Sequence, residues 1–290
     1  MSMVLSEKEL QELHDVLLDA MVQFDVVCKE NGIQYFLGGG TLLGAIRHGG
    51  FIPWDDDVDL MMTRADYDRL CSLPQEAFGP RLFLQTYQTD PEYHGDMAKI
   101  RLNGTTYATE FSSRFPQMHQ GIFIDIFAHD PTARTRLGRK MHIFLTTLCR
   151  SMVFHKWEET PMQYYGKHKL ACKVVTFFIR RVPMRFLEDL REWGYRMFSH
   201  SNSGLLYDGM GMHLSHGAFP AAWLKEAVEV PFEGYRLPVP KEYDKYLRYS
   251  YGDYMKIPAE HQRRLHFIRT LSLTQSFHGV KLDRESTESD

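Results

Sequence analysis

Four aspartates within five positions, Asp55, Asp56, Asp57 and Asp59, are the side chains best suited to chemistry in this sequence. Carboxylates this close repel one another and need cations or wide solvation. Alternate side chains of a strand share a face, so Asp57 and Asp59 are expected to point the same way, a geometry that suits Mg²⁺. Asp55 joins that face if the strand begins early. A solvated acidic turn is the alternative, which the apolar residues on both sides of the cluster disfavour.

A fifth carboxylate, Asp125, lies inside the apolar run GIFIDIF at residues 121–127. Burying an unpaired charge costs several kcal/mol, so this side chain needs a partner. The partner is either a metal ion shared with Asp57 and Asp59 or a buried Lys99 or Arg101. With two metal ions, the three carboxylates would form a site that polarises a phosphoryl group and activates a hydroxyl for attack.

A run of three glycines precedes the acidic cluster and leads into a short helical segment. The backbone N–H groups of Gly39, Gly40 and Thr41 are predicted to face phosphate oxygens, because glycine has no Cβ to obstruct them. The run is neither a Walker loop nor a Rossmann fingerprint, since the required lysine and third glycine are missing. Arg47 is expected to grip phosphate and His48 to orient an acceptor, with surface solvation as the alternative for both.

A second polar and aromatic cluster lies near the end of the chain, in the run YSYGDY at residues 249–254 and the basic residues beyond it. Tyr251 and Asp253, with Arg263, Arg264 and His266, could stack a base or bind its diphosphate. From the residues alone, packing at a helix end is the favoured interpretation.

Hydrophobic periodicity and turn residues predict the elements that must position these side chains. A capping box formed by Ser6 and Glu9 predicts a first helix that ends at 31–32. Beyond residue 128 the chain is expected to be mostly helical, and residues 231–240 to form a hairpin. The other expected elements are strands at 33–37, from 57, 81–86, 97–102 and 121–127, and helices at 41–47, 64–73, 137–157, 164–187 and 241–249.

Composition and charge place the chain among soluble globular proteins, with 290 residues of which 43% are hydrophobic and 24% charged. Disordered, collagenous and fibrous classes are excluded. Residues 133–187 hold a net charge of +10 and the rest −13, which predicts an anionic partner: nucleic acid, anionic lipid or a phosphorylated substrate. Four scattered cysteines and an N-terminus without a signal-peptide pattern favour the cytoplasm. No stretch is apolar enough to predict a transmembrane span, but the basic amphipathic segment 137–187 could rest on an anionic membrane. A buried helical pair with a solvated basic edge is the alternative.

Two adjacent motifs, FLGGGTLLGAIRH at residues 36–48 and FIPWDDDVD at residues 51–59, resemble the LicD family of phosphotransferases. GIFIDIF at 121–127 and YGDYM at 251–255 agree with that family, which is related to the fukutin transferases within the nucleotidyltransferase-fold superfamily. The resemblance implies an α/β (α+β) fold with a mixed sheet flanked by helices, and a helical insertion and C-terminal part. The implied parts are a catalytic core at 1–130, a basic helical region at 131–230 and a segment at 231–290 that completes the nucleotide and acceptor site.

The resemblance also implies a reaction. Family members transfer phosphocholine or ribitol phosphate from a CDP-alcohol to a sugar hydroxyl, such as one on teichoic acid or lipopolysaccharide, and release CMP. The superfamily signature falls on Gly39 and Gly40, on Asp57 and Asp59, and on Asp125. We therefore expect these carboxylates to bind two Mg²⁺ ions, with Mn²⁺ as an alternative. Transfer of a nucleotide from an NTP, or a catalytically silent binding role, are the rival functions, and nucleic-acid binding is disfavoured because no recognised motif is present.

Overall fold

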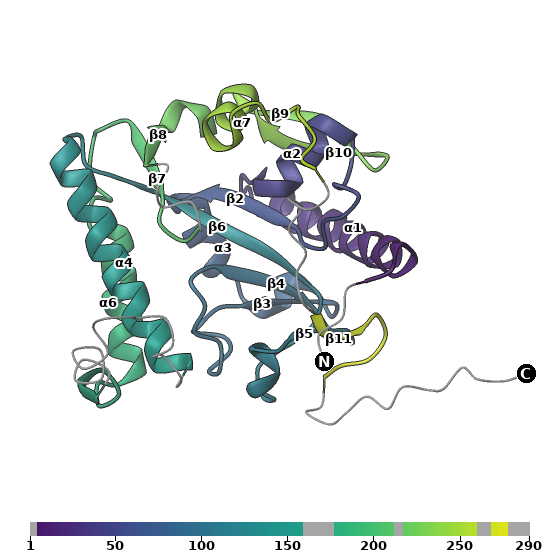
Figure 1. Ribbon diagram of the computed structural model, residues 1–290, viewed down its shortest axis with the longest axis horizontal. Helices are drawn as coiled ribbons and strands as arrows, with labels where there is room; N and C mark the ends of the chain where they lie inside the picture. The colour runs from purple at the N-terminus through teal and green to yellow at the C-terminus, as the bar shows by residue number, and fades with distance from the viewer. Residues whose placement is uncertain (1–4, 159–176, 212–216, 260–267, 278–290) are drawn as a thin grey trace, which may run out of the picture.

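The structure is a computed structural model that describes residues 5–158, 177–211, 217–259 and 268–277. A mixed seven-stranded sheet runs through the middle of the molecule (Figure 1). Its strands are β1 (Phe36–Leu37), β2 (Asp59–Thr63), β3 (Leu82–Gln85), β4 (Ala98–Leu102), β6 (Phe123–Pro131), β7 (Leu205–Asp208) and β8 (Ala218–Pro220). The order is β1-β2-β6-β4-β3, with β7 between β6 and β8. Only β2 and β6 pair in parallel, and the other pairs are antiparallel. This confirms the expected α/β class with a mixed sheet.

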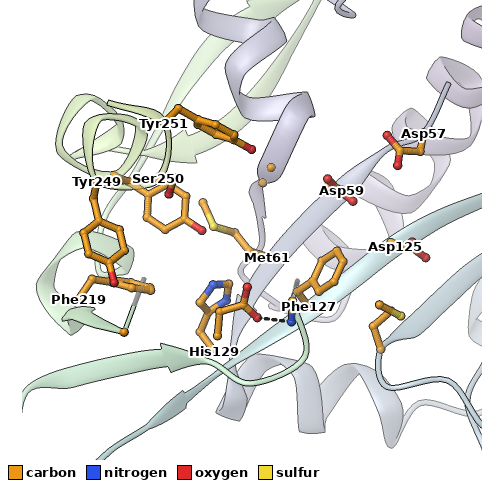
Figure 2. A pocket seen from close by; sticks show the side chains of 17 residues that line it. Asp57, Asp59, Met61, Asp125, Phe127, His129, Phe219, Tyr249, Ser250 and Tyr251 are labelled. Carbon is orange, nitrogen blue, oxygen red and sulfur yellow. Dashed lines mark hydrogen bonds between the residues drawn. The ribbon is translucent and has the colours of Figure 1, made fainter. Parts of the chain in front are cut away.

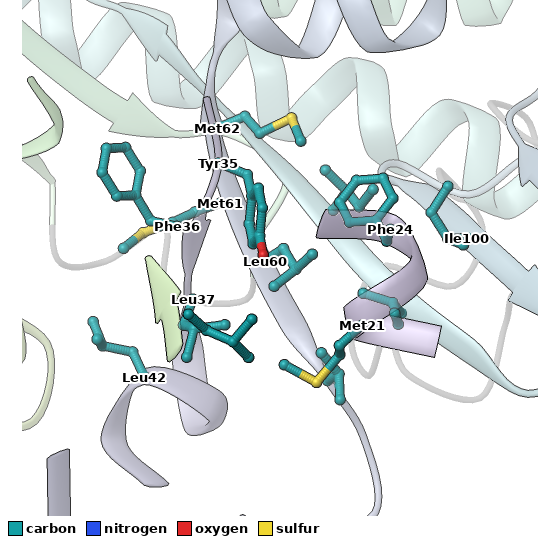
Figure 3. Close-up of a cluster of buried hydrophobic side chains, with 14 of the residues drawn as sticks. Met21, Phe24, Tyr35, Phe36, Leu37, Leu42, Leu60, Met61, Met62 and Ile100 are labelled. Carbon is teal, nitrogen blue, oxygen red and sulfur yellow. The ribbon is translucent and has the colours of Figure 1, made fainter. Parts of the chain in front are cut away.

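The first helix, α1 (Glu7–Glu30), shows why the core forms where it does. The Ser6 hydroxyl accepts a hydrogen bond from the Glu9 N–H, and the Glu9 carboxylate accepts one from the Ser6 N–H. The predicted capping box is therefore confirmed. Leu13, Leu17, Met21 and Phe24 recur at helical spacing and are fully or almost fully buried. Figure 3 shows Met21 and Phe24 packed against side chains of β1, β2 and β4.

The remaining helices surround this sheet. Figure 1 shows α2 (Gly39–His48) and α7 (Tyr243–Tyr251) above it, and α4 (Arg136–Glu158) with α6 (Met184–Arg196) as a pair at one end. The helix α3 (Arg64–Cys71) follows β2 directly, and Gln75–Phe78, Ser112–Arg114 and Ala221–Leu224 are short 3₁₀ helices. No helix in the described part of the chain is long and apolar enough to cross a membrane.

Two smaller antiparallel pairs complete the fold. The strands β9 (Ala227–Phe232) and β10 (Tyr235–Pro240) form the hairpin that the sequence predicted, with Glu233 and Gly234 at its turn. The strand β11 (Ile268–Ser272) pairs with β5 (Thr106–Thr109), so a late segment of the chain returns to its first half.

Several elements differ from the sequence prediction. The helices α4 and α7 and the β9–β10 hairpin lie beyond residue 128 as expected, but β7, β8 and β11 also lie there and were not predicted. The short length of these strands gives them too few residues to show a clear alternation. The helix α2 includes Gly39 and Gly40, and β2 begins at Asp59 rather than earlier. Most of the helix predicted at 164–187 lies outside the described residues, and the division into three parts stays a prediction.

Candidate active site

The parallel pairing of β2 with β6 brings the distant carboxylates together. Asp59 and Asp125 are direct partners in this register, and the Asp125 N–H donates to the Val58 carbonyl at 2.8 Å. Val58 is fully buried, and its packing in the core fixes the backbone between Asp57 and Asp59. Asp57, Asp59 and Asp125 therefore line one pocket, as Figure 2 shows.

The segment that precedes β2 is fixed by three distant elements. His14 of α1 makes a 2.6 Å hydrogen bond through Nε2 with the Asp55 carbonyl oxygen, and Tyr107 of β5 donates its hydroxyl to Asp56 at 2.7 Å. The Phe51 N–H donates to the carboxylate of Glu233 in the β9–β10 turn. These contacts exclude a freely solvated turn, because each acts on a different part of the segment.

The start of α2 approaches the acidic cluster so closely that only glycine fits. A Cβ at Gly39 would lie 2.1 Å from Asp59 Oδ2, and one at Gly40 would lie 2.5 Å from Asp55 Oδ2. Gly39 also has a φ of 45°, which favours glycine. The Gly40 N–H donates to the Asp59 carboxylate, and Thr41 accepts a 2.9 Å hydrogen bond from the Asp59 N–H. These residues thus position Asp59, and their contact with phosphate stays a prediction.

The cluster has an excess of partly buried negative charge. Burial, together with the charges of Asp57, Asp125 and Asp55, raises the pKa of Asp59 well above its usual value. Asp125 has a cationic partner, the ammonium of Lys99 on β4, which lies opposite it in the antiparallel register. The lysine alternative proposed for Asp125 is therefore present, and burial lowers the pKa of Lys99. Arg101 instead donates to Gln85 and the Gly121 carbonyl.

This donor set fits a hard divalent cation. Among the described residues, no three potential ligands converge tightly enough to form a finished metal site. However, the partly buried Asp59 is repelled by three other carboxylates, and an added positive charge would relieve this repulsion. Oxygen ligands of this kind suit Mg²⁺ or Mn²⁺, and Asp57, Asp59 and Asp125 are the residues placed to supply them.

A pocket of about 280 Å³ opens beside the carboxylates. Figure 2 shows the acidic residues on one side and Phe219, Tyr249 and Tyr251 on the other, with Met61, Phe127 and His129 between them. Tyr246 also lines the aromatic side, with its ring 5.3 Å from that of Phe219. A ligand with one anionic end and one apolar or cationic end would match these two walls.

Among the lining residues that were not identified from the sequence are a histidine and an aspartate. His129 of β6 is 2% exposed, and neither of its ring nitrogens has a hydrogen-bond partner of good geometry among the described residues. Asp208 of β7 is its direct partner in the sheet and accepts a 2.7 Å bond from the Gly211 N–H. The pairing of β6 with β7 joins segments far apart in the chain, so no local sequence signal could have revealed it.

The other predicted site residues are distributed unevenly. Tyr251 lines the pocket, whereas Asp253 is exposed in the turn after α7 and does not. Arg47 and His48 lie at the opposite end of α2 from Gly39 and are not among the lining residues. Arg47 there donates to the Tyr254 carbonyl at 3.0 Å and to His48, so it ties α2 to the segment after α7. Arg263, Arg264 and His266 lie outside the described residues.

Carboxylates that can hold divalent cations, beside a helix that begins with glycines, suit an enzyme that acts on phosphorylated substrates. The model of the LicD/FKTN/FKRP nucleotidyltransferase domain matches residues 32–170, the range that contains this cluster. The chain is therefore similar to the LicD family over residues 32–170.

Individual relatives agree with this assignment. The lipopolysaccharide cholinephosphotransferase LicD of Haemophilus influenzae is 29% identical over 264 residues, which cover 90% of this chain and 96% of that protein. Human ribitol 5-phosphate transferase FKRP is 62% identical over 81 residues, but these are only 16% of its length. Mannosyltransferase regulator 4 of Saccharomyces cerevisiae is 32% identical over 114 residues, or 9% of its length. The first two are transferases of phosphorylated alcohols, which supports a phosphotransferase.

Proposed function

We propose that this protein transfers phosphocholine from CDP-choline to a hydroxyl of a cell-surface glycan precursor, of teichoic acid or lipopolysaccharide, and releases CMP. The observation that supports this most is the two-sided pocket, with carboxylates on one wall and aromatic rings on the other. The relative similar over 90% of the chain is named a cholinephosphotransferase, which agrees with this choice of donor.

The aromatic wall favours choline over an uncharged alcohol. A quaternary ammonium is attracted to the faces of aromatic rings and has no hydrogen-bond donors to satisfy. Phe219, Tyr246 and Tyr249 lie on that wall, and the Asp208 carboxylate adds a negative charge nearby. Ring faces accept no hydrogen bonds of this strength from the hydroxyls of ribitol or glycerol, so those alcohols would have to use the polar groups of the same pocket, such as Ser250 and Asp208.

The acidic wall is proposed to hold the diphosphate of the donor through metal ions. Asp57, Asp59 and Asp125 would bind two Mg²⁺, or Mn²⁺, which when bound would neutralise the diphosphate and the charge that develops on the departing CMP. Before the donor arrives, Lys99 partly balances the cluster through Asp125.

The chain's own residues would organise the displacement. The acceptor oxygen forms a bond to the phosphorus distal to cytidine, the bond from that phosphorus to the CMP oxygen breaks, and CMP leaves with the bonding electrons. A carboxylate, Asp125 or Asp55, takes the acceptor's hydroxyl proton. The Lys99 contact holds one Asp125 oxygen in place, and the contacts of His14 and Tyr107 keep the segment with Asp55 fixed.

Release of CMP from a panel of CDP-choline, CDP-ribitol and CDP-glycerol, each with Mg²⁺ or with EDTA, tests the proposal. Teichoic acid and lipopolysaccharide precursors serve as acceptors, and CTP and ATP as control donors. Metal-dependent release from CDP-choline that exceeds release from the other donors is expected. Turnover of CDP-ribitol instead would overturn the choice of alcohol but not the reaction.

The panel also addresses two rivals. Consumption of an NTP with a nucleotide attached to the acceptor would replace the proposal with nucleotidyl transfer. Silence toward every donor would favour a non-catalytic role, for which the similarity to a yeast mannosyltransferase regulator is the specific observation.

A further inference from the structure

The helix α4 buries one face and leaves an apolar face exposed. His142, Thr146, Cys149 and Val153 point inward, where His142 contacts the Gly194 carbonyl of α6. On the opposite side, four large apolar residues recur at spacings of four, three and four, which aligns them along one face of a helix. These residues, here called the outer stripe, are Leu137, Met141, Phe144 and Leu148.

The large apolar side chains of the outer stripe are exposed to solvent. Leu137 is 78% and Phe144 65% exposed, and the other two are about half exposed. On α6, Phe186 and Trp193 are also more than half exposed. Large apolar side chains exposed along one face of a helix mark a candidate interaction site.

The charges beside the outer stripe have one sign. The sequence from 133 to 157 contains six Lys or Arg and no Asp or Glu. Arg134, Arg136 and Lys140, at the start of α4, are exposed. The ligand of this face should therefore combine an apolar phase with negative charge.

We propose that the outer stripe is an interfacial contact with an anionic lipid bilayer. The helix α4 has an apolar face and flanking cations but is not apolar enough to cross a membrane. Such a helix lies in the plane of the lipid headgroups. Anionic lipids supply the negative charge that the flanking cations match. A second copy of the chain fits less well, because a self-complementary contact would bring like-charged flanks together. Figure 1 places α4 at the edge of the molecule, where a flat surface can reach it.

Flotation of the full chain with vesicles tests this inference, which is independent of the proposed reaction. Vesicles of phosphatidylcholine with about 30% phosphatidylglycerol should bind the protein at low salt, and pure phosphatidylcholine should bind it several-fold less. The double variant Leu137→Ser/Phe144→Ser should lose at least about tenfold in partitioning. Each of Arg136→Gln and Lys140→Gln should cost about fivefold.

Matched controls separate this surface from exposed apolar residues in general. Val26 and Met255 are 48% and 54% exposed elsewhere on the molecule, so Val26→Ser/Met255→Ser should bind vesicles like the unchanged protein. Circular dichroism and thermal melting establish that each variant folds. CMP release with soluble substrates should be unchanged in the stripe variant, so a failed reaction and a failed membrane contact are distinguishable.

Three outcomes would overturn the inference. The folded protein could fail to float with anionic vesicles, or the stripe variant could float as well as the unchanged protein. Alternatively, light scattering could show that the unchanged protein is a dimer and the stripe variant a monomer. If neither then bound vesicles, the face would be assigned to a second copy of the chain.

Discussion

Among the described carboxylates of the site, Asp59 has a pKa raised well above its usual value. Its carboxylate is partly buried and is repelled by three others, which raises its pKa, and it accepts a hydrogen bond from the Gly40 N–H. A carboxylate that costs stability to bury in this way is better explained by binding of a cation than by folding.

Replacing Asp59 by Asn is therefore expected to separate activity from stability. Asparagine keeps an oxygen to accept the Gly40 bond but removes the charge, so CMP release should fall by about 100-fold or more. The melting temperature should be unchanged or higher, because the like-charge repulsion is relieved. Steady-state assays and thermal melting check both, with Asp19→Asn, an exposed carboxylate on α1, as the control. A variant that is inactive only because it unfolds would contradict the prediction.

Asp208 is expected to decide which alcohol the pocket prefers. The variant Asp208→Asn keeps the bond from the Gly211 N–H but loses the negative charge beside the aromatic wall. Turnover of CDP-choline at low concentration should fall by about tenfold, mainly through KM, while any turnover of CDP-glycerol should be unaffected. Equal losses with both donors would show that Asp208 acts on the fold or on the diphosphate instead.

At the scale of an element, the turn before β6 contains a histidine whose protonation should loosen the structure. The Gly121 N–H donates to His119 Nδ1 at 3.1 Å, so this nitrogen must stay unprotonated in the folded protein. Burial lowers the pKa of His119 to about 4. Histidine in an unfolded chain has a pKa of about 6.5.

The free energy of unfolding should therefore decrease as the pH falls from about 6.5 toward 4, because only the unfolded chain takes up a proton there. Above that range this histidine contributes no pH dependence. In His119→Asn, the side-chain oxygen can accept the Gly121 bond without titrating, so its stability should fall less between pH 7 and pH 5. Urea denaturation at both pH values measures the free energy of unfolding. If it fell by the same amount from pH 7 to pH 5 in both proteins, His119 would be excluded as the cause.

At the scale of the whole molecule, one carboxylate fastens the α4–α6 pair to the sheet. Asp96 accepts bonds from Arg150 of α4 at 2.8 Å, and from Arg191 and Tyr195 of α6 at 3.2 and 2.9 Å. Arg191 is 1% exposed, so its charge has no access to water as compensation.

Asp96→Ala should consequently destabilise the protein by about 3 kcal/mol, because it removes the carboxylate partner of the buried Arg191 and of the partly buried Arg150. It should also speed proteolysis within α4 and α6 relative to the sheet. Denaturant unfolding and limited proteolysis measure these effects. Asp189→Ala, which removes an exposed pair with Arg185 on the same helix, should change stability by less than about 1 kcal/mol. If both variants lost equal stability, Asp96 would not be the fastening point.

The sequence by itself determined the local features of this protein. The capping box at Ser6, the hairpin at 231–240 and the close spacing of Asp57 and Asp59 each depend on residues a few positions apart. Their physical causes, a side chain that caps a helix, a turn that reverses a strand and charges that repel, act over the same short range. These features could therefore be inferred without knowing the fold.

Only the tertiary structure decided which distant residues share the site. The register of β2 with β6 sets Asp59 beside Asp125, and that of β4 with β6 selects Lys99 rather than Arg101 as its partner. The pairing of β6 with β7 adds His129 and Asp208, which the sequence analysis did not identify. Strand register depends on how complete faces of the sheet bury their side chains, so it is a property of the assembled core and not of any local pattern.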